Sequence, residues 1–395
     1  MTAEARPSAE MPQEASAKAK RPRVVHLSTF HRSSDMRIFH KECRSLAAAG
    51  FEVHWVAPEP APEPLDGVIF HPVKDCFYPY GLRRLWASSR DAWRIARDLD
   101  ADLYHFHDTL LIPVGSLLRL RRRRVIFDVH EDAVPQALSL GRDAGKPLLG
   151  VALAAVRWVL EAYAKLFWSA FVCVTPHIAK KFPARRTVMA RNFPLREEVE
   201  ALVEAGEPYA QRPPEVLYVG GITAIRGARE MVAAAGRWQQ AEARLVLVGP
   251  FAEESLEAEL QGDPAWDRVE ALGYQLRPGV LRALGRARVG LAVLHPRPNY
   301  QLAYPVKLFE YMAAGIPVVV SDFPLWRSIV ESADCGLVVD PLDPEAIAAA
   351  VDRLLENPQE AEAMGQRGRK AVMETFNWSR EAETLSALYR RLMGE

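Results

Sequence analysis

The sequence has few cysteines and no excess of charge of either sign. Its 395 residues include four cysteines, which are widely separated and never form a C-x-x-C pair. This spacing excludes a disulfide framework and a cysteine-based zinc site, and it fits a reducing cytoplasm. The 50 acidic residues balance the 50 basic ones, so no overall field favours nucleic acid. We therefore expect a cytoplasmic protein that does not bind nucleic acid.

Several motifs of common enzyme classes are also missing. The chain has no G-x-G-x-x-G, G-x-x-x-x-G-K-[ST] or G-x-S-x-G, which argues against a dehydrogenase, a P-loop enzyme and an α/β-hydrolase. His130 and Glu131 begin an H-E-x-x-H pattern, but its last position is Val134, so the metalloprotease reading fails. No carboxylate cluster suggests a divalent metal. We expect neither a metal nor a cofactor.

No segment is an uninterrupted membrane span or a signal peptide. Residues 1–22 lack an apolar core, and we expect them to be a disordered leader. The apolar stretch 147–171 contains three charged residues, and an arginine run at 121–124 follows the apolar residues 117–120. Two readings stay open for this region. It is either a buried helix with a solvated charge run, or a peripheral contact with anionic lipid.

Short β-branched runs alternate with longer helical patterns from residue 23 onward. This alternation predicts parallel, doubly wound sheets, and the pattern restarts after a polar, proline-containing stretch at 204–214. We expect an α/β protein with two Rossmann-like domains and a ligand cleft between them. The predicted parts are an N-terminal domain at 23–200, a linker at 201–213, a C-terminal domain at 214–375 and a last helix at 376–395.

The segment from Tyr304 to Asp322 predicts a helix followed by a buried strand. Pro305 suits the first helical position, and Gly315 suits a left-handed stop. Lys307 and Glu310 are three residues apart and therefore share one helix face. Lys307 lies in the first turn, where backbone N–H groups already favour anions. A cation for phosphate beside a carboxylate for ribose is what a nucleotide-sugar site needs.

This segment, P-x-K-L-F-E-Y-M-A-A-G-x-P-V-V, resembles the signature of retaining glycosyltransferases of family 4. The resemblance implies the GT-B fold, a metal-independent mechanism and a last helix that crosses back onto the first domain. Many members carry two glutamates eight positions apart. Here Glu310 matches the second, whereas the first position is Leu302. The alternative for Lys307 and Glu310 is a surface ion pair on an ordinary helix.

A second candidate donor contact is the glycine turn that follows the strand at 216–219. Gly220 and Gly221 allow a ligand to approach the backbone, and Arg226 adds a permanent charge at the next helix start. The family that this chain resembles usually has V-G-R-L and a later K-G in this segment. The chain has Gly221-Ile222 in place of R-L and Arg226 in place of the lysine, so one of the two expected cations is missing from the turn. Lys307 is its natural replacement. The plain alternative is an ordinary turn with a surface arginine.

The candidate acceptor side lies in the N-terminal domain. His130 ends a strand and fills the position where the resembled family places a histidine beside the donor sugar. Asp35 and Arg37 follow the first strand, and His107 and Asp108 follow another. We predict all four as acceptor-side groups. For His130 the alternative is a capping network at the end of its strand.

These features together predict a retaining glycosyltransferase that moves a sugar from a nucleoside diphosphate to a hydroxyl acceptor. His130 is the predicted catalytic residue, and the resemblance implies same-face transfer. We expect a glycan, lipid-linked or small-molecule acceptor, and a role in cell-surface polysaccharide or glycolipid assembly. A nucleotide-sugar 2-epimerase, a non-catalytic partner subunit and transfer to a secondary metabolite stay open.

Overall fold

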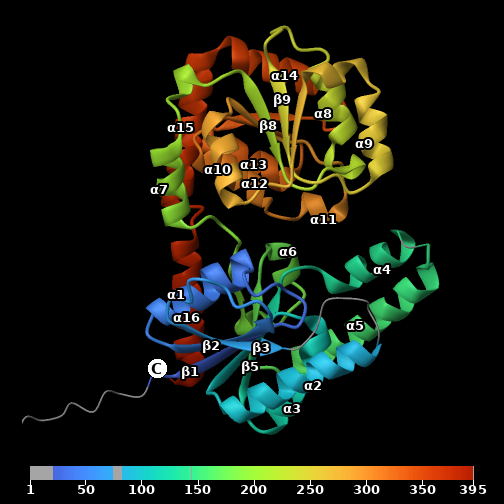
Figure 1. The fold of residues 1–395 in the computed structure, drawn as a ribbon. Helices are drawn as coiled ribbons and strands as arrows, with labels where there is room; N and C mark the ends of the chain where they lie inside the picture. Colours follow the sequence, from blue (N-terminus) through green and yellow to red (C-terminus); the bar gives the residue numbers. More distant parts are fainter. Residues whose placement is uncertain (1–20, 74–81, 144, 395) are drawn as a thin grey trace, which may run out of the picture.

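The computed structural model describes residues 21–73, 82–143 and 145–394, which form two α/β domains, one above the other in Figure 1. All but the last two residues of the predicted leader lie outside these ranges. Two wholly parallel sheets form the centres of the domains, as the alternating pattern predicts. Their inner strands are buried on both faces, which explains the continuous apolar runs in the sequence, whereas the strands at the sheet edges are partly exposed.

The N-terminal sheet has the strand order β3-β2-β1-β4-β5-β6-β7. Its strands are β1 (Arg23–Leu27), β2 (Glu52–Pro58), β3 (Val68–Val73), β4 (Leu103–Phe106), β5 (Arg124–Val129), β6 (Ala170–Cys173) and β7 (Thr187–Met189). The helices around it are η1 (Met36–Cys43), α1 (Arg44–Ala48), α2 (Leu82–Leu99), η2 (Thr109–Leu111), α3 (Ile112–Leu120), α4 (Ala133–Asp143), α5 (Pro147–Phe167), α6 (Pro176–Ala179) and η3 (Ala184–Arg186). The order reverses between β1 and β4, which is where such sheets place their sites.

The C-terminal sheet has the order β10-β9-β8-β11-β12-β13. Its strands are β8 (Glu215–Val219), β9 (Arg244–Val248), β10 (Val269–Gly273), β11 (Val289–Ala292), β12 (Val318–Ser321) and β13 (Gly336–Val339). The remaining helices are α7 (Arg196–Ala205), η4 (Tyr209–Gln211), η5 (Ala224–Arg226), α8 (Ala228–Ala235), α9 (Glu254–Gln261), η6 (Pro264–Arg268), α10 (Arg277–Arg286), α11 (Pro298–Gln301), α12 (Val306–Ala313), α13 (Pro324–Ala333), α14 (Pro344–Glu356), α15 (Pro358–Glu374) and α16 (Trp378–Met393).

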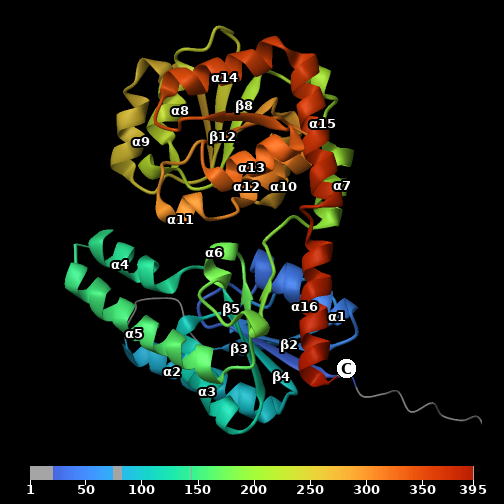
Figure 2. The same ribbon diagram turned by 180° about the vertical axis from the view of Figure 1, so that it is seen from behind.

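The chain passes between the domains twice. On the first pass, Ala190 belongs to the N-terminal core and Phe193 to the C-terminal core. On the return, α15 packs on the C-terminal domain, whereas Trp378 and Tyr389 of α16 are buried in the N-terminal core. Figure 2 shows these two helices in line along one edge of the molecule. A last helix on the first domain is what the family resemblance implies.

The first helix of the N-terminal domain begins as the π-helical segment η1, where the carbonyl of Asp35 accepts the N–H of His40 at 3.3 Å as well as that of Phe39 at 3.0 Å. Pro305 is the N-cap of α12 rather than its first residue, and Gly315 adopts the expected left-handed φ of 67°. Pro305 has an extended ψ of 118°, so the helix begins one residue later.

Within the described residues, α5 is the one helix that is long and apolar enough to cross a membrane. It packs beside α4 as a hairpin that projects from the N-terminal domain in both ribbon views (Figures 1 and 2). Only 22% of its most apolar window is buried. The expectation of a buried helix at this position is therefore wrong for most of its length.

Candidate active site

A glycine turn ends β8 on the side of the C-terminal domain that faces the other domain. Gly220 has a φ of 127°, which an L side chain rarely adopts. The turn is closely packed, because a Cβ atom added to Gly249 would lie 2.1 Å from the Gly220 carbonyl oxygen. The hydroxyl of Tyr311, on α12, accepts the backbone N–H of Val219 at 2.9 Å. This bond fixes α12 against the turn.

Two cations border this turn. Lys307 Nζ lies 3.5 Å from the centre of the Tyr218 ring, is buried, and has no hydrogen-bond partner among the described residues. Arg226 Nη1 donates to the Gly221 carbonyl at 3.3 Å. Burial, and then repulsion by Arg226, lowers the pKa of Lys307 well below its usual value. A bound anion would supply the hydrogen-bond acceptor that Lys307 Nζ lacks.

The glycines place the backbone directly against these cations. A Cβ atom at Gly220 would lie 3.3 Å from Lys307 Nζ, and one at Gly221 would lie 3.2 Å from Arg226 Nη1. Side chains at these positions would therefore occupy the space beside both charges. The four residues predicted for the donor phosphates lie together, as a phosphate site requires.

Glu310 lies one turn beyond Lys307 on α12 and is engaged by a partner that sequence reasoning missed. Arg277, from the start of α10, places Nη1 2.5 Å from Glu310 Oε1 and Nη2 3.0 Å from Glu198 Oε1. Glu310 is therefore held in place by an ion pair. Leu302, at the position of the resembled family's first glutamate, is 40% exposed at the end of α11.

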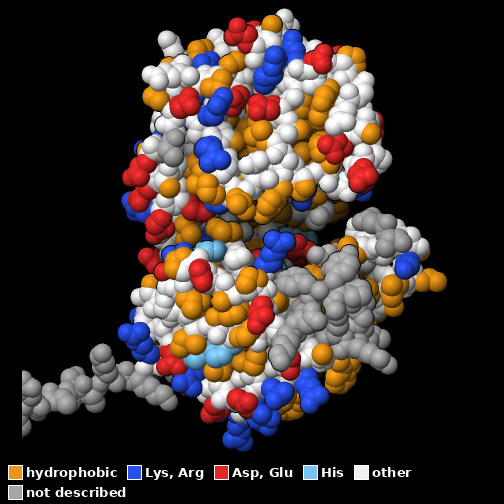
Figure 3. All heavy atoms as spheres, in the orientation of Figure 1, with side chains coloured by type: hydrophobic (Ala, Val, Ile, Leu, Met, Phe, Trp, Pro, Cys, Tyr) orange, Lys and Arg blue, Asp and Glu red, His pale blue; other side chains and the backbone are white. Residues whose placement is uncertain are grey.

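The N-terminal domain meets this region through η1. Lys41 donates to Asn192 Oδ1 at 2.7 Å and lies within electrostatic reach of Glu198, Glu310 and Arg277. Burial is the main cause that lowers the pKa of Lys41 to about 8. Figure 3 shows the surface hollowed between the two domains at this level. Lys41 is thus a further polar group at the junction that the sequence did not reveal.

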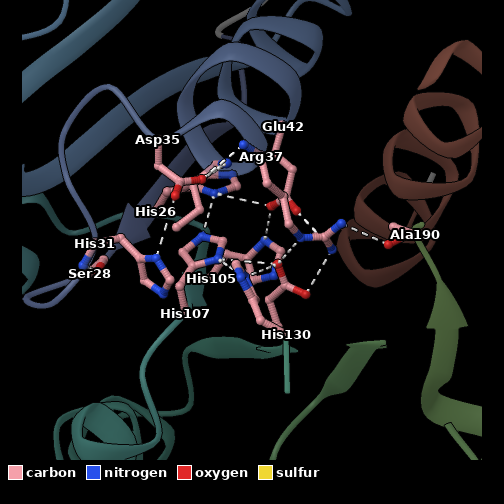
Figure 4. Close-up of polar contacts among 12 residues, drawn as sticks. His26, Ser28, His31, Asp35, Arg37, Glu42, His105, His107, His130 and Ala190 are labelled. Atoms are coloured by element: carbon pink, nitrogen blue, oxygen red, sulfur yellow. Dashed lines mark hydrogen bonds and ion pairs between the residues drawn. The ribbon is translucent and has the colours of Figure 1, made fainter. Parts of the chain in front are cut away.

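Asp128, at the end of β5, organises the polar groups of the N-terminal domain. Its partners Arg37, His107 and His130 converge in Figure 4. Arg37 clasps its carboxylate with Nη2 at 3.0 Å and Nε at 3.2 Å, and donates to the Ala190 carbonyl at 2.8 Å. Burial alone would raise the pKa of Asp128, but Arg37 and the neighbouring histidines hold it well below its usual value. Arg37 Nη2 also lies 3.1 Å from buried Glu42. Asp128 is therefore an ionised carboxylate in the protein interior.

A chain of four buried side chains leads away from this carboxylate. His107 Nδ1 lies 3.2 Å from Asp128, and its Nε2 lies 3.0 Å from His26 Nδ1. The Tyr389 hydroxyl joins His26 Nε2 at 3.0 Å to His105 Nδ1 at 2.7 Å. Because Asp128 can only accept, His107 must donate to it, and each later group must then donate toward Asp128. This direction leaves a lone pair on His105 Nε2, a buried nitrogen that has no hydrogen-bond partner among the described residues.

His130 also donates to Asp128, with Nε2 at 2.8 Å from Oδ2, and it is partly exposed. Its ring lies 5.0 Å from that of His31, a residue that sequence reasoning missed. His31 contacts Asp35 at 3.6 Å and Asp108 at 3.7 Å, and these carboxylates raise its pKa although burial lowers it. The two histidines form a polar patch where β1, β4 and β5 end.

The structure divides the predicted acceptor-side residues into two groups. Asp35 and Asp108 flank His31, although each also serves the backbone: Asp35 accepts the N–H groups of Arg37 and Ile38, and Asp108 accepts that of Thr29. Arg37 and His107 are buried and act on Asp128. An acceptor would therefore meet His31 and His130 before either of them.

A metal centre is the alternative use of these histidines. His26, Glu42, His105 and His107 have ligand atoms within 4.8 Å of one another. However, the facing nitrogens are engaged in the directed chain, and the Arg37 guanidinium beside Glu42 opposes a dication. A hydrogen-bonded network accounts for the histidines without a metal.

Acid should destabilise the protein through this network. Burial lowers the pKa values of His26 and His105, and it lowers that of His107 to about 4. The unfolded chain takes up these protons near pH 6.5, whereas the folded chain does not, so stability falls as pH falls from about 6.5 to about 4. Burial raises the pKa of Glu42, so the folded chain binds a proton there that the unfolded chain does not. This offsets the proton uptake of one of the three histidines.

The net uptake of two protons predicts a loss of about 3 kcal/mol per pH unit in this range. Urea unfolding between pH 7 and 5 measures it. His107→Gln should give a shallower slope, and His177→Gln, whose side chain is 43% exposed, should not change it. A flat stability profile in the unmodified protein would contradict the burial of neutral histidines.

Comparison with known proteins identifies relatives of both halves of the chain. Residues 213–357 match the family model described as "Glycosyl transferases group 1", and residues 36–191 match that of "Glycosyltransferase Family 4". The α-(1→4)-mannosyltransferase of Mycolicibacterium hassiacum is 30% identical over 24% of this chain and 23% of its own length. Glycogen synthase of Mycobacterium tuberculosis is 25% identical over 78% of this chain and 72% of its own. The first four curated relatives are matched over 23% to 48% of their lengths.

Solved structures share the two-domain architecture across almost the whole chain. Sucrose-phosphate synthase from Thermosynechococcus elongatus superposes with a TM-score of 0.70 at 21% identity, covering 94% of this chain and 99% of its own. Anabaena HepE, solved with UDP-glucose, gives 0.68 at 14% identity, covering 93% and 99%. At these identities the similarity shows the fold, which is GT-B.

Proposed function

The chain belongs to the group 1 glycosyltransferases, and we propose that it transfers a sugar from a nucleoside diphosphate to a hydroxyl acceptor with retention of configuration. One observation carries this proposal: the buried, unpartnered Lys307 Nζ and the Arg226 guanidinium border the same glycine turn. Two cations beside exposed backbone suit a diphosphate leaving group.

The proposed mechanism places negative charge on the departing diphosphate. Glycosyl transfer has an oxocarbenium-like transition state, and charge collects on the leaving oxygen as the bond breaks. Arg226 and Lys307 would stabilise that charge, while Glu310, steadied by Arg277, would hold the ribose. His130 would contact the sugar from the other domain. Domain closure would exclude the water that otherwise hydrolyses the donor.

We propose further that the donor diphosphate needs no divalent metal, since the two cations provide the neutralising charge. Hydrolysis of UDP-, GDP- and dTDP-sugars, with and without EDTA, tests both the use of a nucleotide-sugar donor and the independence from a divalent metal. We expect one nucleotide class to be turned over and EDTA to change the rate by less than about twofold. A rate that EDTA abolishes, and that magnesium restores, would contradict metal independence.

The same screen separates the competing functions. Inversion at C2 without an acceptor would show an epimerase, and tight donor binding without turnover on any acceptor would show a non-catalytic subunit. The screen covers uracil, guanine and thymine nucleotides.

We propose a lipid-linked glycan as the acceptor, at the cytoplasmic face of the membrane, in polysaccharide or glycolipid assembly. The projecting apolar α4–α5 hairpin supports a lipid-borne substrate over a soluble one. Transfer to a soluble secondary metabolite in preference to any lipid-linked acceptor would contradict this part of the proposal.

A further inference from the structure

Helix α5 has the reverse polarity of a water-exposed surface helix. Its side chains Leu148, Trp158 and Leu166 are 85%, 62% and 71% exposed. Its charged residues turn toward the protein instead: Glu161 is 5% exposed, and Arg157 donates to groups of α4 at 2.8 and 2.9 Å. A helix that faces water shows the opposite arrangement. The outward face of α5 is therefore suited to an apolar environment.

The α4–α5 hairpin cannot cover this face by closing on itself. The two helices already touch backbone to backbone, since a Cβ atom added to Gly141 would lie 2.4 Å from Gly150 Cα. Among the described residues, 11 of the 26 exposed large hydrophobic side chains belong to these two helices. Figure 3 shows hydrophobic side chains on the projecting hairpin, to the right of the gap between the domains.

A strongly basic segment adjoins the C-terminal end of α5. Arg119 Nε donates to the Phe167 carbonyl at 2.8 Å, which joins the end of α3 to the end of α5. Residues 109–127 contain five arginines and no acidic residue, in a chain whose total charge is balanced. Leu120 within this segment is 76% exposed, and Phe167 is 51% exposed. Apolar and basic surfaces therefore meet at one place.

We propose that the α4–α5 hairpin and the arginine segment 119–124 dock together on an anionic phospholipid bilayer, with α5 lying in the plane of the interface. The apolar face would enter the acyl boundary, and the arginines would meet lipid phosphates. Glu161 is buried on the inward side of α5 and Arg157 is bonded to α4, so α5 keeps one side on the protein and does not span the membrane. Exposed Trp158 suits the interfacial depth.

A second copy of the chain fits this surface less well than lipid does. A two-fold dimer would pair the surface with itself and bring the two arginine segments, in which Arg123 alone is paired with a carboxylate among the described residues (Asp100), close to each other. This docking rests on the proposed function. The hairpin flanks the gap between the domains, so docking would bring a lipid-borne acceptor to that gap.

Co-sedimentation of the full chain with vesicles tests the docking. We expect binding to mixed phosphatidylcholine–phosphatidylglycerol vesicles, weaker binding to pure phosphatidylcholine, and loss of the difference at high salt. Val151→Glu with Val159→Glu, two exposed positions on one face of α5, should reduce binding more than about tenfold. Arg122→Glu should reduce it about fivefold or more. Leu276→Glu, at a 71% exposed site in the other domain, is the matched control and should bind normally.

Three outcomes would overturn the docking proposal. The first is no vesicle binding by the unmodified chain, and the second is binding that the α5 variant retains. The third is a dimer in analytical ultracentrifugation that the α5 variant dissociates, which would assign the face to a second copy. Thermal stabilisation by a nucleotide sugar separates the docking proposal from the proposed function. The α5 variant, which should lose vesicle binding, should still be stabilised by the donor. Vesicle binding without any response to nucleotide sugars would leave the docking intact and contradict the proposed function.

Discussion

Lys307→Ala should lower kcat/KM for the donor about a hundredfold or more, a loss of about 3 kcal/mol of transition-state stabilisation. The buried Nζ has no hydrogen-bond partner among the described residues, so a diphosphate would be the anion that it binds directly. Arg226→Ala should act similarly, because its Nη1 borders the same turn. The matched control is Arg229→Ala, which removes an exposed arginine of α8 paired with Glu259 at 2.6 Å. Steady-state kinetics across all three variants measures the effect.

A pH signature distinguishes a phosphate contact from a structural role for Lys307. Burial lowers the pKa of this lysine, whereas a bound diphosphate would raise it again, so donor binding takes up a proton. Donor affinity should therefore weaken as pH rises through the lowered pKa. Lys307→Ala should lose that pH dependence along with affinity. Unchanged donor affinity in both Lys307→Ala and Arg226→Ala would show that the donor binds elsewhere.

Arg37→Ala should destabilise the fold by about 3–5 kcal/mol at pH 7. Removing the guanidinium leaves Asp128 and Glu42 buried beside each other without a cation, and breaking a buried ion pair in this way is strongly destabilising. It also deprives the Ala190 carbonyl of a donor at 2.8 Å. Urea unfolding measures the loss. Arg196→Ala, which removes an exposed arginine, should cost less than about 1 kcal/mol.

The pH dependence of the Arg37 variant gives a second readout if the protein remains folded. Without Arg37, burial would raise the pKa of Asp128, so the folded variant would bind a proton that the unfolded chain does not. This contribution adds stability as pH falls, whereas the buried histidines of the unmodified protein remove it. The free energy of unfolding of the variant should therefore fall less steeply as pH falls than that of the unmodified protein. An identical acid profile in both proteins would contradict the ionised state of Asp128.

The fold was predictable because its signals are local. The inner parallel strands are buried on both faces, so runs such as Val318 to Val320 are apolar at every position, and helical stretches separate them. The reverse polarity of α5 was not predictable, because an apolar helix bears the same sequence pattern whether it faces a core or a membrane. Only the three-dimensional neighbours decide that Glu161 points inward.

The donor half of the candidate site was predictable, and the acceptor half only in part. Lys307 and Arg226 lie in segments where a turn and a helix start define their places. The Arg277 contact joins residues 33 positions apart, and the Tyr389 contact with His26 joins residues 363 apart. No spacing rule connects such pairs. The sequence places the histidines at strand ends. Their burial, and the order in which they are hydrogen-bonded to one another, depend on three-dimensional packing.

The two passages of the chain between the domains are bound to each other, since the N–H of Trp378 donates to the Pro194 carbonyl at 2.8 Å. Phe193 also packs edge-on against Phe376, with ring centres 5.5 Å apart. Both connections therefore lie side by side along one edge of the molecule. This pairing favours rotation of the domains about that edge, because sliding of one domain across the other would break it. Such a rotation would move the parts farthest from the edge most, so under the proposed function the opening there would set the size of the acceptor that can enter.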